Sequence, residues 1–156
     1  MEYSEQLAQA INDFLVEDDW KFHFDEEKNV FKFSCEIKSK LKGVDCIIRV
    51  KEDSYMVLAI CNLSAEDCKA QMAEFITRAN YGLNNGNFEM DYNDGEIRYK
   101  IFVDCEDDMP SKAVIKNSIY LPIMMFQRYG DGLASVIFDV KTPEQAVNDS
   151  EADLDD

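Results

Sequence analysis

Residues 78–100 read RANYGLNNGNFEMDYNDGEIRYK, and this stretch decides the fold. Gly82 follows a helical pattern and suits the position just beyond a helix end, where the backbone turns left-handed. The next residues alternate between polar and apolar, as in a half-buried strand whose apolar members are Phe88, Met90 and Tyr92. Asp94-Gly95 is among the strongest two-residue hairpin signals, and a second alternating run follows at 97–103. The stretch therefore predicts a helix end, a strand, a tight turn and a return strand.

More strands are predicted upstream of this stretch. Apolar and polar residues alternate over 20–24, 31–37 and 44–50, with short polar segments between them. This pattern indicates an antiparallel meander with one face buried. The run 55–61 is apolar at every position, so we expect both faces of that strand to be covered.

Helices are predicted at both ends and in the middle of the chain. Apolar residues recur at helical spacing over 3–17 and 65–81, and again after Ser111. Ser4 and Ser111 precede these patterns and suit the N-cap position. Pro122 is expected to kink the last helix or to begin a second one.

The end of the chain divides into a folded part and a tail. Gly130-Asp131-Gly132 is expected to break the helical pattern, and a short helix or strand is expected to follow it. After Lys141 there are six carboxylate side chains and no Lys or Arg, so we predict one domain over 1–141 and a disordered acidic tail over 142–156. The fold class is α+β, a twisted antiparallel sheet with helices on one face, in the order α-β-β-β-(β)-α-β-β-α.

Composition limits the classes of partner. The formal net charge is −16, which disfavours nucleic acid and anionic membranes as partners. The N-terminus lacks the pattern of a secretory signal, and no apolar run approaches a membrane span of roughly 20 residues, so we expect a cytoplasmic protein. The chain has 5 scattered cysteines, an odd number typical of reduced thiols, and we expect those within strands to be small core residues.

No motif for catalysis is present in the sequence. His23 is the only histidine and falls on the polar side of its strand, so a catalytic or metal site based on several histidines cannot form. Asp91-Tyr92-Asn93-Asp94-Gly95 resembles the start of a calcium loop, but its glycine and its closing acidic residue are not at the required positions. Glu106, Asp107 and Asp108 form an acidic loop, most simply a solvated turn. We therefore expect a protein that is not an enzyme and carries no cofactor.

Two apolar sets remain as candidates for a partner or dimer surface, with ordinary core as the alternative for both. The first lies on the otherwise polar side of the predicted sheet and contains Ile47, Met56, Leu58, Ile60 and Phe102. The second belongs to the run IYLPIMMF at 119–126 and contains Ile119, Leu121, Met124 and Met125. The flexible side chain of methionine suits a surface that fits more than one partner.

The segment 86–99 resembles the hallmark of the YbjN-like bacterial domain family. In that family a strand of the form G-x-F-x-x-D, here 86–91, leads to a D-G-x-x-x-Y/F return strand, here 94–99. The strand with Trp20 also fits, and the resemblance spans roughly 5–138. It implies a fold similar to type III secretion chaperones, usually dimeric, in proteins described as regulators without an established biochemical activity.

These observations favour a protein-binding module, a regulator or chaperone that acts as a homodimer on a protein partner. The alternative from another class is a sensor of a small molecule or metal, with a pocket near the 104–108 loop.

Overall fold

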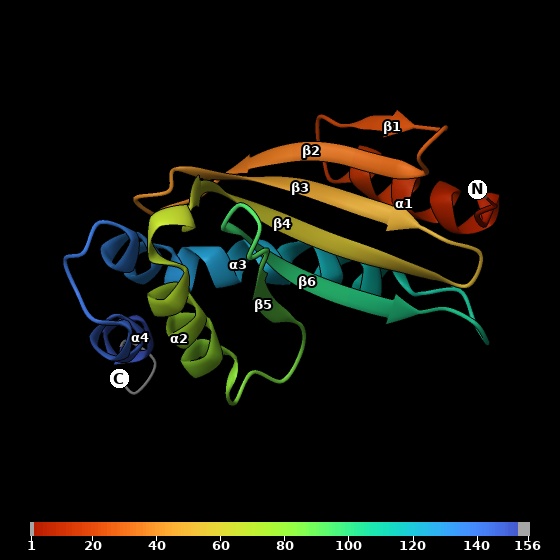
Figure 1. Ribbon diagram of the computed structural model, residues 1–156. Helices are drawn as coiled ribbons and strands as arrows, with labels where there is room; N and C mark the ends of the chain where they lie inside the picture. Colours follow the sequence, from red (N-terminus) through yellow and green to blue (C-terminus); the bar gives the residue numbers. More distant parts are fainter. Residues whose placement is uncertain (1, 153–156) are drawn as a thin grey trace.

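The computed structural model describes residues 2–152 and contains one antiparallel sheet with helices packed against it (Figure 1). The strands are β1 His23–Asp25, β2 Val30–Glu36, β3 Gly43–Val50, β4 Ser54–Ser64, β5 Asn87–Met90 and β6 Glu96–Asp104. The helices are α1 Glu5–Glu17, α2 Lys69–Asn80, α3 Lys112–Ile137 and α4 Pro143–Ala152, with a short 3₁₀ turn, η1 Glu66–Cys68, before α2. The α+β class and the predicted order are confirmed, with β4 as a full strand.

The sheet has 6 strands in the order β1-β2-β3-β4-β6-β5, and every neighbouring pair is antiparallel. The predicted hairpin joins β5 to β6. Gly95 in its turn has a φ of 75°, in the left-handed region that glycine adopts without strain. α2 and β5 intervene in sequence between β4 and β6, yet these two strands pair over most of their length. The edge strands β1 and β5 are short, with 3 and 4 residues.

One face of the sheet is covered by α1 and α3, which lie behind it in Figure 1. α1 begins at Ser4, whose Oγ accepts a hydrogen bond from Leu7 N at 3.1 Å, as predicted for an N-cap. α1 and α3 are joined at Asp18, whose carboxylate accepts hydrogen bonds from Trp20 at 2.9 Å and from Tyr120 at 2.5 Å. α2 and α4 pack together at one end of the sheet, against the second half of α3.

The predicted break in the last helix is wrong. α3 is a single helix of 26 residues that contains both Pro122 and the Gly130-Asp131-Gly132 segment. The two glycines are explained by close packing, since a Cβ at Gly132 would lie 2.9 Å from the backbone oxygen of Ala146 on α4, and one at Gly130 would lie 3.0 Å from Leu41 Cδ1. Tertiary contacts thus require small residues within a continuous helix, where the isolated sequence suggested an end.

The predicted disordered tail is also wrong for the part of the chain that the structure describes. Residues 143–152 form α4, and its Ala146 and Val147 are buried, with 0% and 4% of their surface exposed. α4 packs on α2 and α3, so the domain extends beyond residue 141. An acidic helix with few apolar residues still folds here because its small apolar side is covered. Residues 153–156 lie outside the described residues. Within 2–152, no helix has the length and apolar character needed to cross a membrane.

Candidate functional site

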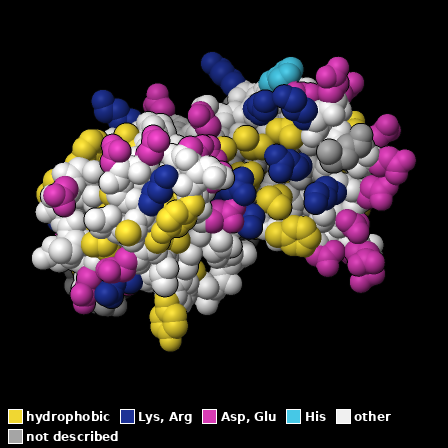
Figure 2. All heavy atoms as spheres, in the orientation of Figure 1, with side chains coloured by type: hydrophobic (Ala, Val, Ile, Leu, Met, Phe, Trp, Pro, Cys, Tyr) yellow, Lys and Arg dark blue, Asp and Glu magenta, His cyan; other side chains and the backbone are white. Residues whose placement is uncertain are grey.

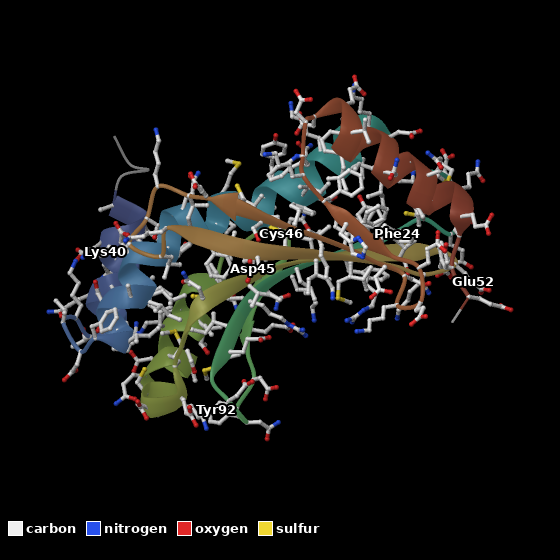
Figure 3. All side chains as sticks on the ribbon, turned by 90° about the horizontal axis from the view of Figure 1, so that it is seen from above. Phe24, Lys40, Asp45, Cys46, Glu52 and Tyr92 are labelled. Carbon is white, nitrogen blue, oxygen red and sulfur yellow. The ribbon has the colours of Figure 1, made fainter. Side chains whose placement is uncertain are left out.

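The second face of the sheet is the candidate site, and we call it the open face. Successive residues of a strand point to opposite faces, and Figure 3 shows Cys46 on the helix side of β3 and its neighbour Asp45 on the other side. Within residues 2–152, no helix covers the open face over β2, β3 and the adjoining parts of β4 and β6 (Figure 1). The central part of the open face comprises Lys32, Asp45, Ile47, Arg49, Met56, Leu58, Ile60, Glu89, Arg98, Lys100 and Phe102; His23, Asp25, Ser34, Glu36 and Asp104 share this side of the sheet around it.

Strand register arranges these side chains in rows. One row across β2, β3, β4 and β6 reads Lys32, Ile47, Leu58, Lys100. The next row reads Arg49, Met56, Phe102 across β3, β4 and β6. On the other side, the row Asp45, Ile60, Arg98, Glu89 runs across β3, β4, β6 and β5. The column along β4 is therefore apolar from Met56 to Ile60, and the columns beside it carry charges.

The first predicted set lies together on this face, with different degrees of exposure. Phe102 has 58% of its surface exposed, an unusual value for a phenylalanine in the middle of a strand. Ile47, Met56 and Ile60 are half-buried. Leu58 is buried although no described helix packs over it, between its cross-strand neighbours Ile47 and Lys100. The prediction that both faces of β4 are covered holds at Leu58 and is wrong at Met56 and Ile60.

The second predicted set does not form a surface. Ile119 and Met125 have 0% and 7% of their surface exposed and belong to the core, so the surface prediction is wrong for them. Leu121 is partly buried and packs against the core. Met124 alone of this set is exposed, at 55%. The reason is that α3 contacts the sheet on one side and other helices on another, so most of the segment 119–126 is enclosed.

Basic residues frame the apolar column, and these were missed by sequence reasoning. Figure 2 shows Lys and Arg side chains grouped around hydrophobic ones over the strands, while acidic side chains dominate elsewhere in that view. Lys32 and Arg49 lie on the β2–β3 side, and Arg98 and Lys100 lie on β6. Each strand contributes only one or two of them, so no basic run marks the cluster in the sequence. The one trace of the cluster in the sequence is that each basic residue points to the same face of the sheet as Ile47 and Leu58.

Glu89 is the main acidic residue that engages these cations. Its carboxylate forms ion pairs with Arg98 and with Lys100, the latter at 3.0 Å. Partial burial raises the pKa of Glu89, but hydrogen bonds from Lys100 and Arg98 outweigh it and hold the pKa below its ordinary value. Among the described residues, Lys32 and Arg49 have no ion-pair partner. These two cations are free to meet charges from outside the molecule.

The remaining candidates for chemistry are not activated. Burial raises the pKa of the Cys46 thiol to about 12 and that of Cys61 to about 11, so both thiols stay protonated at neutral pH. Both are buried, as predicted for small core residues. His23 is exposed on β1, in the same row of the sheet as Lys32.

The 104–108 loop forms a turn in which Asp104 accepts a hydrogen bond from Glu106 N at 3.0 Å. A cavity of about 500 Å³ lies beside it and is lined by Glu2, Lys51, Glu52 and Asp53, so the loop's own acidic residues do not build it. Within residues 2–152, no group of three His, Cys, Asp or Glu side chains is arranged to hold a metal ion. The metal-sensor alternative therefore has no ligand set in the described residues.

Comparison with known proteins identifies a fold. No family model matches the sequence, and no curated protein matches it either. The fold is α+β with a YbjN-like arrangement of sheet and helices: the chain is similar to the crystal structure of YbjN from E. coli, described as "a putative transcription regulator". The TM-score is 0.56 over 84% of this chain and 88% of that chain, at 9% sequence identity. The expected YbjN-like fold is confirmed at this level.

Proposed function

We propose that the protein is a non-enzymatic binding module that recognises a protein partner through the open face and serves as a regulator or chaperone. The observation that carries this proposal is the half-buried pair Met56 and Ile60 on β4, with the exposed ring of Phe102 beside Met56 and no described helix over them. Single exposed apolar residues are common, whereas neighbouring apolar side chains on an uncovered sheet face are typical of interaction sites.

The geometry of the open face suits binding better than catalysis. Its apolar side chains stand on a continuous sheet, so they are held in fixed positions by backbone pairing on both sides. Its charged groups are spread around the apolar column and do not converge on one point, as groups acting on a reacting atom must. The similarity in fold to YbjN, described as "a putative transcription regulator", also supports a regulatory role.

A homodimer remains part of the proposal. A dimer formed through the open face would cover the apolar surface proposed here for the partner protein. The exposed side of α3 is the alternative contact, and Met124 is the residue of the segment 119–126 that is available for it.

A comparison of two double variants tests the role of the open face. Met56→Ser with Phe102→Ser removes apolar surface from the open face, and Phe138→Ser with Val140→Ser removes exposed apolar surface elsewhere. Partners are recovered by cross-linking in a lysate of the host and identified by mass spectrometry. The wild type and the Phe138→Ser, Val140→Ser variant should recover partners that the Met56→Ser, Phe102→Ser variant does not. Equal recovery with both variants would contradict the proposal.

A further inference from the structure

We propose that the open face binds an acidic amphipathic helix of the partner protein. This inference rests on the proposed function and adds the chemistry and the shape of the partner segment.

The centre of the open face differs in charge from the chain as a whole. In the sequence, 32 acidic residues face 16 basic ones. In the three central rows of the open face, Lys32, Arg49, Arg98 and Lys100 stand with Asp25, Asp45 and Glu89, so basic residues are four against three there; Glu36 and Asp104 lie at the ends of their strands. At an ionic strength near 0.1 M charges are screened over about 10 Å, so a bound segment senses these local cations more than the distant carboxylates. The local field therefore selects an acidic segment.

The spacing of the columns fits one α-helix. The apolar column on β4 lies between β3 and β6, and adjacent strands are about 4.8 Å apart, so the flanking columns are about 10 Å from each other. A helix with its side chains is about 10–12 Å across. It would place an apolar stripe on Met56, Ile60 and the ring of Phe102, and hold acidic residues beside Arg49 on one flank and Lys100 on the other.

The length of the column sets the size of the bound segment. From Met56 to Ile60 the strand rises about 14 Å, at about 3.4 Å per residue. A helix rises about 1.5 Å per residue, so about nine residues, between two and three turns, cover the column. Lys32 lies one strand further out than Arg49 and extends the basic flank on that side.

The side chains of the open face favour a protein segment over nucleic acid. Sheets that read single-stranded nucleic acid stack several bases on aromatic rings. Phe102 is the one aromatic ring among the open-face residues, and the apolar column beside it is aliphatic. Aliphatic side chains match leucine-type residues of a helix, with charge-assisted hydrogen bonds at its flanks.

Binding of two synthetic peptides tests this inference. One is a three-turn helical peptide with leucines along one side and glutamates on both flanks, and its twin carries lysines in place of the glutamates. Lys32→Glu with Arg49→Glu reverses two exposed charges of the open face. Lys38→Glu with Lys116→Glu is the control, since it makes the same change in net charge at exposed positions outside the open face. Affinities are measured by fluorescence anisotropy at low and at raised salt, and unfolding curves check that each variant is folded.

The glutamate peptide should bind the wild type and the control variant about tenfold more tightly than it binds the open-face variant, and more weakly as salt rises. The lysine peptide should bind the wild type more weakly than the glutamate peptide does. The inference is overturned if the twin binds equally well, if neither peptide binds, or if a single-stranded oligonucleotide binds more tightly. If Met56→Ser with Phe102→Ser weakens both peptides while charge reversal changes neither, the binding role of the open face stands and the acidic partner is excluded.

Discussion

The two faces of the sheet are made by the same strands and differ in what surrounds their apolar residues. On the covered face, Ile48 and Val57 pair across β3 and β4 and are enclosed by helices, with 0% and 1% of their surface exposed. On the open face, Ile47 and Leu58 form the next pair and are bounded by Lys32 and Lys100. The difference teaches that apolar character alone does not distinguish core from recognition surface. The charged residues at the border of an apolar group are what distinguish a recognition surface from core.

The largest effect is expected for a charge placed on the enclosed side of α3. Met125→Asp should lower the free energy of unfolding by more than about 4 kcal/mol, because an unpaired carboxylate would replace a buried side chain. Met124→Asp, one residue away and exposed, should change it by less than about 0.5 kcal/mol at protein concentrations too low for self-association. Urea unfolding of both variants measures the difference, and equal losses would contradict the assignment of Met125 to the core.

The Met124 variant also tests the proposed dimer. Light scattering at tens of micromolar should give the mass of two chains for the wild type and a reduced mass for Met124→Asp. A wild-type protein that is strictly monomeric under these conditions rules the dimer out. A dimer that Met124→Asp leaves intact uses another surface.

A smaller difference is expected between neighbouring residues of β3. Ile48→Ala should cost about 2–5 kcal/mol, because it leaves a cavity under α1 and α3. Ile47→Ala should cost about 1 kcal/mol, because water fills the space on the half-buried open face. Thermal unfolding of the two variants gives the comparison directly. Similar costs would mean that the open face is packed as tightly as the covered one.

The smallest effect concerns the ion pairs of Glu89. The folded-state pKa of Glu89 is lowered, so its contribution to stability is present above the ordinary pKa of about 4.5 and is lost as pH falls through the folded-state value. Glu89→Gln should therefore destabilise the protein at pH 7 by less than about 1 kcal/mol and make no difference at low pH. Unfolding curves of both proteins from pH 7 to pH 3 check this. A difference that persists in acid would assign the effect to packing.

The sequence predicted much of the fold because alternation and capping are local signals. Ser4, Ser111 and Asp94-Gly95 act within a few residues, and the structure confirms each of them. Gly130 and Gly132 were misleading because the residues that pack closely against them belong to the β2–β3 loop and to α4, far away in sequence. Ala146 and Val147 were missed because two small apolar residues form a helix only when α2 and α3 cover them.

The candidate site was only half visible in the sequence. Its apolar members stood out because Ile47 and Met56 occupy positions where alternation leads one to expect polar residues. The basic border could not be recognised, because it depends on the pairing of β4 with β6 across an intervening helix and strand. Strand order and register are set by contacts between distant residues, and these are not written in any single segment.

The short edge strands have a consequence for how this protein meets others. A long free edge lets any extended chain join a sheet through main-chain hydrogen bonds, which is a route to aggregation. Here each edge is divided into short pieces: β1 and β5 have 3 and 4 residues, and beyond their ends 33–36 of β2 and 101–104 of β6 form separate short edges. Contact with a partner is thereby left to side chains on the broad side of the sheet. Specificity can then change by substitution of a few exposed residues while the backbone that carries them stays the same.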